Sequence, residues 1–335
     1  MESAKNFNLM QALKENAIYL VLLVLLMVIV IQEPSFLSLT NFSNILTQSS
    51  VRVIIALGVA GIIITQGTDL SAGRQVGLAA LIAATMLQAL TNVNKVFPTL
   101  GEVPIPAVIL LVCVVGALIG LVNGLIVAYL NVTPFITTLG TMIIVYGINS
   151  LYFDSVGASP VAGFDPRFSS FAQGFIRIGG FKLSYLTFYA AIASVFVWVL
   201  WNKTRFGKNI FAIGGNPEAA KVSGVNVAVN LVMIYALAGV FYAFGGMLEA
   251  GRIGSATNNL GFMYELDAIA ACVVGGVSLQ AGGTVAGVIT GVLIFTLINY
   301  GLTYIGVSPY WQFIIKGGII ILAVALDSMK YAKKK

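Results

Sequence analysis

The sequence predicts an all-helical membrane protein with about ten transmembrane helices and with both termini in the cytoplasm. The chain has 335 residues, of which 59% are hydrophobic and only 9% are charged. A helix needs roughly 20 apolar residues to cross the bilayer core, so this composition supplies enough for about ten crossings. The apolar residues form unbroken runs, whereas the strands of a membrane barrel would alternate apolar and polar residues. The same composition excludes a soluble enzyme, a disordered chain and a disulfide scaffold.

Separate apolar runs support this count, and we expect residues 1–335 to form a single domain. The first run follows two lysines and is similar to a signal peptide, but it ends without the small residues of a cleavage site. It is therefore interpreted as a retained helix. The runs lie at residues 17–31, 51–66, 76–91, 105–130, 135–152, 184–201, 229–250, 266–279, 285–304 and 311–327.

The distribution of lysine and arginine favours cytoplasmic termini, because cytoplasmic loops carry the excess of positive charge. The strongest contributions are the basic stretch at residues 203–208 and the closing lysines, both beside a helix end. Lys316 is expected inside the membrane. The lysines and arginines expected on the cytoplasmic side are Lys5, Lys14, Arg74, Lys203, Arg205, Lys208, Lys221, Lys330, Lys333, Lys334 and Lys335. Those expected on the external side are Arg52, Lys95, Arg167, Arg177, Lys182 and Arg252.

Composition also argues against catalysis and metal binding. The chain has no histidine, which excludes histidine-based proton relays and imidazole ligands. Its two cysteines lie far apart in apolar runs and are interpreted as small buried residues. The sequence also lacks the Gly-x-x-x-x-Gly-Lys-Ser/Thr loop that cradles nucleotide phosphates. We therefore expect no catalytic residue, no metal site and no cofactor in this chain.

The cytoplasmic connection at residues 202–228 contains the local signals of a short helix. Asn216 can cap the free amides, and Pro217 suits the first helical position. Glu218 lies at the positive end of the helix dipole, and Gly224 can adopt the left-handed conformation that ends a helix. Because a helix of about two turns is unstable alone in water, it must pack on its own membrane helices or dock on another protein.

Four motifs follow one another along the chain. Residues 67–73 read Gly-Thr-Asp-Leu-Ser-Ala-Gly, residues 133–140 begin with Thr-Pro-Phe, residues 212–225 contain the capped helix, and residues 264–271 contain Glu-Leu-Asp-Ala-Ile-Ala. In this order and spacing they resemble the sugar permeases of ATP-binding-cassette importers, of the ribose and galactose type. The resemblance covers essentially the whole chain and is strongest to the galactose and methyl galactoside permeases. The chain departs from that pattern at the turn around Gln280, which is about one residue short.

The resemblance implies a permease subunit, not an enzyme, in the bacterial inner membrane that imports galactose, methyl galactoside or glucose. It implies a separate ATPase that binds ATP and Mg²⁺, a periplasmic sugar-binding protein and a second permease copy, and no nucleic acid. The residues implied to contact the ATPase are Asn216, Pro217, Glu218, Ala219, Ala220, Lys221, Val222, Ser223 and Gly224.

An ion-coupled secondary transporter of a small polar solute is the alternative. Such a transporter should have buried acidic residues near mid-membrane. The acidic residues Asp69, Glu249, Asp267 and Asp327 are instead expected near helix ends, which disfavours it.

Polar residues within apolar runs are candidates for a gate or a sugar pathway, and each also has a structural interpretation. Asp69 gates the pathway, forms a second contact with the ATPase, or caps the next helix. Membrane threonines either line a pathway or bond to their own helix, and asparagines either face sugar or join helices. The candidate set is Asp69, Ser71, Arg74, Thr137, Thr138, Thr141, Asn149 and Asn299.

Charged residues on the expected external connections are candidates for docking a binding protein. Mutual charge pairing is the alternative interpretation. The docking candidates are Asp165, Arg167, Arg252 and Glu265.

Overall fold

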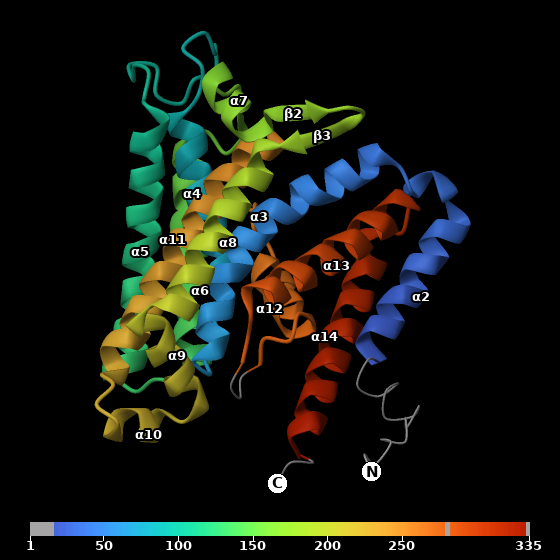
Figure 1. Ribbon diagram of the computed structural model, residues 1–335. Helices are drawn as coiled ribbons and strands as arrows, with labels where there is room; N and C mark the ends of the chain where they lie inside the picture. Colours follow the sequence, from blue (N-terminus) through green and yellow to red (C-terminus); the bar gives the residue numbers. More distant parts are fainter. Residues whose placement is uncertain (1–16, 279–281, 333–335) are drawn as a thin grey trace.

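The computed structural model describes residues 17–278 and 282–332 and shows a mostly helical molecule (Figure 1). The predicted helical, polytopic class is confirmed. Expectations for Lys5, Lys14, Gln280 and the closing lysines lie outside the described residues. The helices are α2 (Ala17–Gln32), η1 (Pro34–Phe36), α3 (Leu39–Ile64), α4 (Ala72–Met86), α5 (Ile105–Tyr129), α6 (Pro134–Ser155), α7 (Pro166–Gln173), α8 (Tyr185–Lys203), α9 (Arg205–Gly215), α10 (Pro217–Val222), α11 (Val227–Ile253), α12 (Tyr264–Val274), α13 (Val285–Tyr304) and α14 (Pro309–Ala332).

Six helices among the described residues are long and apolar enough to cross a membrane, namely α3, α5, α6, α8, α11 and α13. The count of ten crossings therefore stays a prediction. The expected run at 266–279 forms α12, which has 11 residues. At about 1.5 Å per residue, this helix is too short to cross the bilayer alone.

Helix α3 begins earlier than the apolar run at 51–66 indicates. It has 26 residues, and the Ser38 hydroxyl accepts a hydrogen bond from the Asn41 amide at its start. Its first turns are polar, with Asn41 and Ser43 buried, so hydropathy alone does not reveal them. The earlier start places Arg52 in the middle of the helix instead of on an external connection, which corrects the expectation for that residue.

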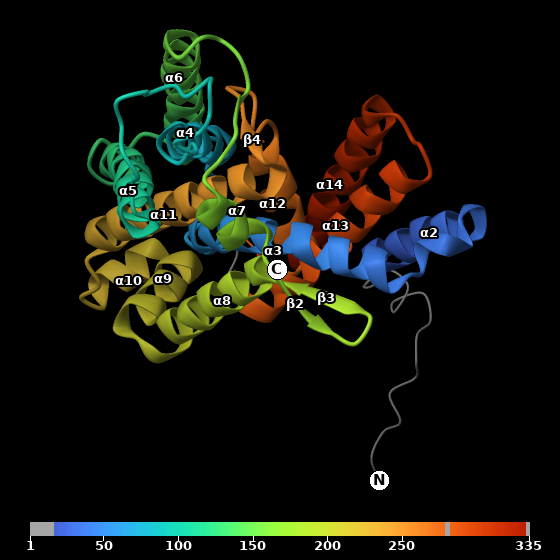
Figure 2. The same cartoon turned by 90° about the horizontal axis from the view of Figure 1, so that it is seen from above.

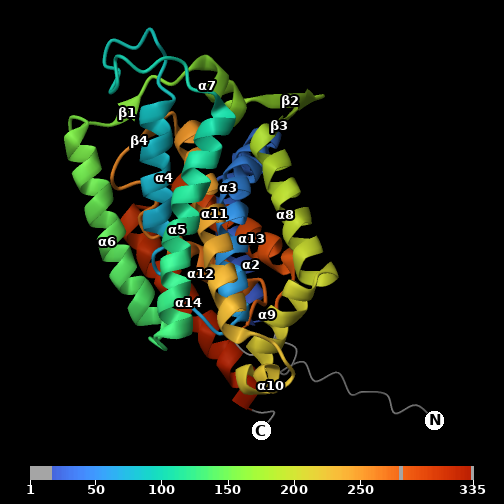
Figure 3. The ribbon, with the colours of Figure 1, turned by 90° about the vertical axis from the view of Figure 1, so that its left-hand side faces the viewer.

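Helix α11 lies at the centre of the molecule, against α3, α4 and α5 (Figure 3). Its contact with α5 is made by glycines: a Cβ on Gly239 would overlap the carbonyl oxygen of Gly116, and a Cβ on Gly120 would overlap that of Tyr235. Small residues allow such close backbone approach where lipid offers no hydrophobic driving force.

Two irregular segments lie between the helices. Residues 65–71 follow α3, and residues 257–263 precede α12. The second segment meets the first turn of α4, where a Cβ on Gly73 or on Gly261 would overlap the carbonyl oxygen of the other glycine. Irregular backbone is tolerated at membrane depth only when it is buried in protein or lines a cavity. Helices α4 and α12 therefore begin inside the molecule.

The two ends of the molecule carry different elements (Figures 1 and 3). Helices α9 and α10 lie at one end, and α14 ends on that side. Helix α7 lies at the other end with two small antiparallel sheets, one of β1 (Val161–Ala162) and β4 (Ser255–Ala256), the other of β2 (Phe175–Ile178) and β3 (Phe181–Ser184).

Candidate functional site

A buried polar cluster joins the segment after α3 to α4, α5 and α6. The Asp69 carboxylate accepts hydrogen bonds from the Ser71 amide (2.9 Å) and the Ser71 hydroxyl (2.5 Å). The Ser71 oxygen accepts from the side-chain amides of Gln75 (2.9 Å) and Asn123 (3.1 Å). Thr141 donates to Asn123 Oδ1 at 2.6 Å. The candidates Asp69, Ser71 and Thr141 thus lie together, whereas sequence reasoning missed Gln75 and Asn123.

The threonines at the start of α6 differ in their bonding. The Thr138 hydroxyl accepts from the Leu70 amide (3.1 Å) and donates to the Pro134 carbonyl of its own helix (2.8 Å). Thr137 is also buried, but its hydroxyl has no hydrogen-bond partner in the part of the chain that the structure describes. The same holds for Gln75 Oε1. These two buried groups therefore have unused hydrogen-bonding capacity.

Arg74 lies where the segment 257–263 meets α4. Its guanidinium carbon lies 4.2 Å from the ring centroid of Tyr146 and 5.2 Å from that of Phe262. Arg74 Nη1 and Glu265 Oε2 are buried and have no hydrogen-bond partner among the described residues. The site therefore holds one cation and one carboxylate that aromatic rings and backbone enclose.

The two candidate asparagines lie in different places. Asn149 is buried in α6 and donates to the Asn258 carbonyl at 3.1 Å, so it holds the segment 257–263 in place. Asn299 lies on α13, away from this cluster, and its Nδ2 atom has no partner in the described chain. The structure therefore groups Asn149, but not Asn299, with the pathway candidates.

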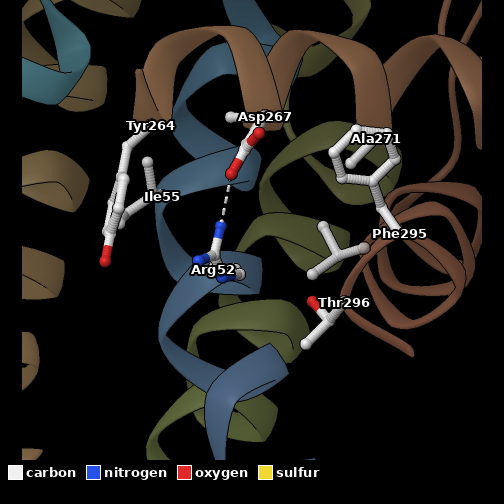
Figure 4. Close-up of a pocket in the computed structure, with 9 residues that line it drawn as sticks. Arg52, Ile55, Tyr264, Asp267, Ala271, Phe295 and Thr296 are labelled. Atoms are coloured by element: carbon white, nitrogen blue, oxygen red, sulfur yellow. Dashed lines mark hydrogen bonds and ion pairs between the residues drawn. The ribbon is translucent and has the colours of Figure 1, made fainter. Parts of the chain in front are cut away.

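An ion cluster inside the helical body was not expected from the sequence (Figure 4). Arg52 Nη1 lies 2.7 Å from Asp267 Oδ2, and Lys316 Nζ lies 3.1 Å from Asp267 Oδ1. The cluster joins α3, α12 and α14, and it supplies the partner of Lys316 that the sequence alone does not identify. Asp267 lies in the first turn of its helix, as expected, yet it is only 8% exposed. It is paired with two cations, so it does not form the unpaired acidic site of an ion-coupled transporter.

The ion cluster continues through Tyr264 toward the end of α11. Arg52 stacks on the Tyr264 ring at 4.8 Å, and the Tyr264 hydroxyl donates to Glu249 at 2.6 Å. Arg252 binds the same carboxylate through Nε at 2.7 Å. Glu249 and Glu265 are buried. Two of the four docking candidates are therefore accounted for within the molecule. Arg252 pairs with Glu249, and Glu265 is buried.

The other two docking candidates form a surface pair at the start of α7. Asp165 accepts from the Arg167 amide (2.8 Å) and binds its guanidinium at 3.0 and 2.9 Å. Glu102 lies 2.9 Å from the same guanidinium. The hydrogen bonds from Arg167 hold the pKa of Asp165 below its ordinary value, and the two carboxylates raise the pKa of Arg167.

The predicted short helix is confirmed as α10. The Asn216 side chain accepts from the Ala219 amide at 3.0 Å, and Gly224 has a φ of +85°. Ala220 is buried, whereas Val222 is 89% exposed. Of the predicted contact set, Glu218, Lys221 and Ser223 are also exposed. Helix α10 therefore packs on the molecule through one side and presents the rest, including an apolar residue, to the surroundings.

Helix α9 connects α10 to the buried cluster. A Cβ on Gly214 would overlap the carbonyl oxygen of Ile64 at the end of α3. Gln66 donates to the Gly214 carbonyl at 2.7 Å. Because Gln66 lies three residues before Asp69, α9 contacts the segment that carries Asp69.

The comparisons with known proteins agree with one another. The family model described as branched-chain amino acid transport system / permease component matches residues 41–324. The chain is 76% identical to the galactose/methyl galactoside import permease of Haemophilus influenzae over 336 residues, 100% of this chain and 99% of the relative. It is 79% identical to that of Escherichia coli over 324 residues, 96% of each. The ribose import permease of Escherichia coli is 37% identical over 322 residues, 95% of each. No solved structure matches the chain.

Proposed function

The chain belongs to this family of permease components, and we propose that it imports galactose and methyl galactoside as the membrane subunit of an ATP-driven transporter. The resemblance noted in the sequence is confirmed by these relatives, which support a sugar permease of the ATP-binding-cassette class. The chain is a multi-pass protein of the inner membrane and is not itself an enzyme.

The choice of sugar rests on the two sets of relatives. Identity is 76–79% to three permeases named for galactose and methyl galactoside and 39% to a fourth, from Treponema pallidum, whereas it is 36–39% to those named for ribose. Glucose differs from galactose in the orientation of one hydroxyl group, so we include it as a further hexose. These sugars are neutral, which suits a pathway bounded by hydroxyl and amide groups.

The proposed importer has three kinds of partner. An ATPase binds ATP and Mg²⁺, because the sequence has no phosphate-cradling loop of its own. A periplasmic protein captures the sugar, and a second permease copy completes the transporter. High affinity resides in the binding protein, since tight binding inside the membrane would slow release.

The contact of α9 with α3 is the observation that carries the proposed mechanism. Helix α10 presents an exposed surface for the ATPase, and α9 follows its movement as a rigid neighbour. Gly214 and Gln66 transmit that movement to the segment that holds Asp69. Closure of the ATPase on nucleotide thus reaches the polar cluster through the contacts of Gly214 with Ile64 and Gln66.

The pathway is proposed to run past the polar cluster and Arg74. Asp69, Ser71, Thr138 and Thr141 form its hydrogen-bonded wall. The free Thr137 hydroxyl exchanges hydrogen bonds with the passing sugar. The remaining proposed lining residues are Arg74 and Asn149, whereas Asn299 lies elsewhere.

Uptake of labelled galactose into proteoliposomes that contain permease, ATPase and binding protein tests the proposal. A proline disfavours the helical conformation of the residue before it, so Glu218→Pro forces Pro217 out of the first turn of α10, and we expect this variant to abolish both uptake and stimulated ATP hydrolysis. Glu218→Ala keeps the helix and is the matched control. Normal uptake by the proline variant at equal membrane amount contradicts the coupling role. Uptake that collapses with the ion gradient while ATP is constant supports the secondary transporter instead.

A further inference from the structure

A small hairpin projects from the end of the molecule opposite α10. Strands β2 and β3 pair antiparallel, and the two-residue turn Gly179–Gly180 joins them. Gly179 has a φ of +61°, the left-handed conformation that such turns require. Figures 1 and 2 show the hairpin extending sideways from the helical body, across the helix axes. This direction is parallel to the surface of a membrane that the helices cross.

The register gives the hairpin two chemically different faces. Residues directly opposite in an antiparallel pair share a face, and successive residues alternate between faces. The pairs Ile176↔Leu183 and Ile178↔Phe181 form an entirely apolar face. The pairs Arg177↔Lys182 and Phe175↔Ser184 form the other, which carries two cations.

The apolar face is continuous with the exposed start of a membrane helix. Ile176 and Ile178 are 45% and 60% exposed. Phe181 packs on Phe42 of α3 with ring centroids 5.9 Å apart, and the Ser43 hydroxyl donates to the carbonyl of Lys182. The apolar residues exposed beside them at the start of α3 are Leu37, Leu39 and Phe42. An apolar surface that continues a membrane-crossing helix fits the edge of the hydrocarbon core.

The cationic face lacks a counter-charge. Arg177 and Lys182 lie directly opposite each other, an arrangement that destabilises a sheet. Both stack on the Phe175 ring, at 5.5 and 5.1 Å from its centroid. Neither forms an ion pair with any described residue. An anion that accepts from both side chains, such as a phosphate, would remove the repulsion.

We propose that the hairpin is an interfacial anchor that binds the phosphate groups of lipid headgroups through Arg177 and Lys182. Ile176 and Ile178 enter the boundary between headgroups and acyl chains, as the apolar face of an interfacial element does. Helix α8 begins at Tyr185, directly after β3, and this tyrosine is 37% exposed, which suits an aromatic residue at the interface. The hairpin thereby fixes the depth of α8. This role does not depend on which sugar is carried.

Neighbouring residues on opposite faces allow a matched test of insertion. Ile178→Cys and Arg177→Cys are each labelled with a small fluorophore in the Cys113→Ala protein, because Cys113 is half-buried whereas Cys272 is fully buried. The full chain is reconstituted in nanodiscs of phosphatidylethanolamine and phosphatidylglycerol with brominated acyl chains. We expect quenching by the brominated chains to be about threefold stronger at position 178 than at position 177, and quenching by aqueous iodide to show the reverse order.

Two results would overturn the assignment. Strong iodide quenching at both positions, without quenching by lipid, would mean that the hairpin stands in water. Protection of position 178 only after addition of a galactose-binding protein would make the hairpin a protein-docking surface instead.

A second measurement addresses the phosphate contact. Added phosphatidylglycerol should raise the Tm of the solubilised wild-type chain, and Arg177→Gln with Lys182→Gln should reduce that rise by about half. The exchange Arg177→Lys with Lys182→Arg keeps both charges and should retain it. Inorganic phosphate at equal concentration should give no rise, which separates a lipid from a free ion. An unchanged rise in the double glutamine variant would contradict the phosphate contact, whatever the outcome of sugar uptake.

Discussion

Two neighbouring glycines at the end of α9 have opposite surroundings. A Cβ on Gly214 would overlap the Ile64 carbonyl, whereas a Cβ on Gly215 would meet open space. Alanine is otherwise the better helix former of the two residue types. Any loss at position 214 alone therefore reports the contact with α3 and not the stability of α9.

We expect Gly214→Ala to lower galactose uptake by about tenfold by separating α9 from α3, with stimulated ATP hydrolysis falling in parallel. Gly215→Ala should behave as the wild type in the same proteoliposomes. Equal uptake by the two variants would show that movement does not pass through this contact.

Two buried threonines of α6 provide a second contrast. Thr141 donates to Asn123, whereas the Thr137 hydroxyl has no partner among the described residues. Thr141→Val leaves a buried acceptor unpaired, so we expect the free energy of unfolding to fall by about 1–3 kcal/mol. Thr137→Val should leave it unchanged or raise it. Denaturation of the two variants in the same detergent, followed by circular dichroism, measures the difference.

Residue types in short motifs predict part of this cluster. Asp69 and Ser71 stand in a glycine-rich motif, and Thr138 and Thr141 follow Pro134, so they attract notice in the sequence. Asn123 stands alone in an apolar run, and Gln75 stands beside Arg74 just before one. Only the packing of α4 against α5 reveals what they bind.

The helices differ in how far their own sequence determines them. Helix α10 could be predicted with its cap and its end, because all of its signals lie within nine residues. The extent of α3 and the shortness of α12 could not. From the sequence alone, Arg52 is interpreted as the end of a membrane run, because its counter-charge, Asp267, lies 215 residues away along the chain. A long-range ion pair of this kind leaves no local pattern.

Helices α3, α12 and α14 are held together by one carboxylate. Asp267→Asn leaves the half-buried Arg52 and Lys316 side by side without their shared carboxylate, so we expect a loss of about 1.5–3 kcal/mol in the free energy of unfolding. Adding Lys316→Met to that variant removes one of the two cations and should restore part of the loss. Chemical denaturation of the single and double variants tests this, and additive losses would contradict it.

Helix α7 should respond to acid. The lowered pKa of Asp165 means that its cap and ion pair contribute stability above its ordinary pKa, about 3.9. That contribution disappears as the pH falls through the lowered value. We expect pepsin to cut the segment around α7 faster as the pH falls below about 4. The pH dependence of pepsin itself is measured on an unfolded peptide and subtracted. After this correction, cutting of Asp165→Asn should not become faster as the pH falls, whereas cutting of the wild type should.

At the scale of the whole molecule, α10 and α7 mark opposite ends (Figure 3). The basic residues Lys203, Arg205 and Lys208 predict that α10 lies in the cytoplasm, because cytoplasmic connections carry the excess of positive charge. In the Cys113→Ala protein, an impermeant maleimide should label Ser170→Cys but not Ser223→Cys in intact spheroplasts, and inverted vesicles should give the reverse. Labelling of both residues from one side would refute the predicted orientation.

The meeting of Gly73 and Gly261 has a consequence for leakage through the closed transporter. Exposed side chains change rotamer within picoseconds to nanoseconds, so a seal made of mobile side chains would open on that timescale. These two glycines touch through backbone alone, and Gly261 has a φ of +84° that favours glycine. Opening therefore requires whole segments to move, which takes microseconds to milliseconds. In the proposed transporter, a barrier at this contact would open through movement of whole segments and not through thermal motion of individual side chains.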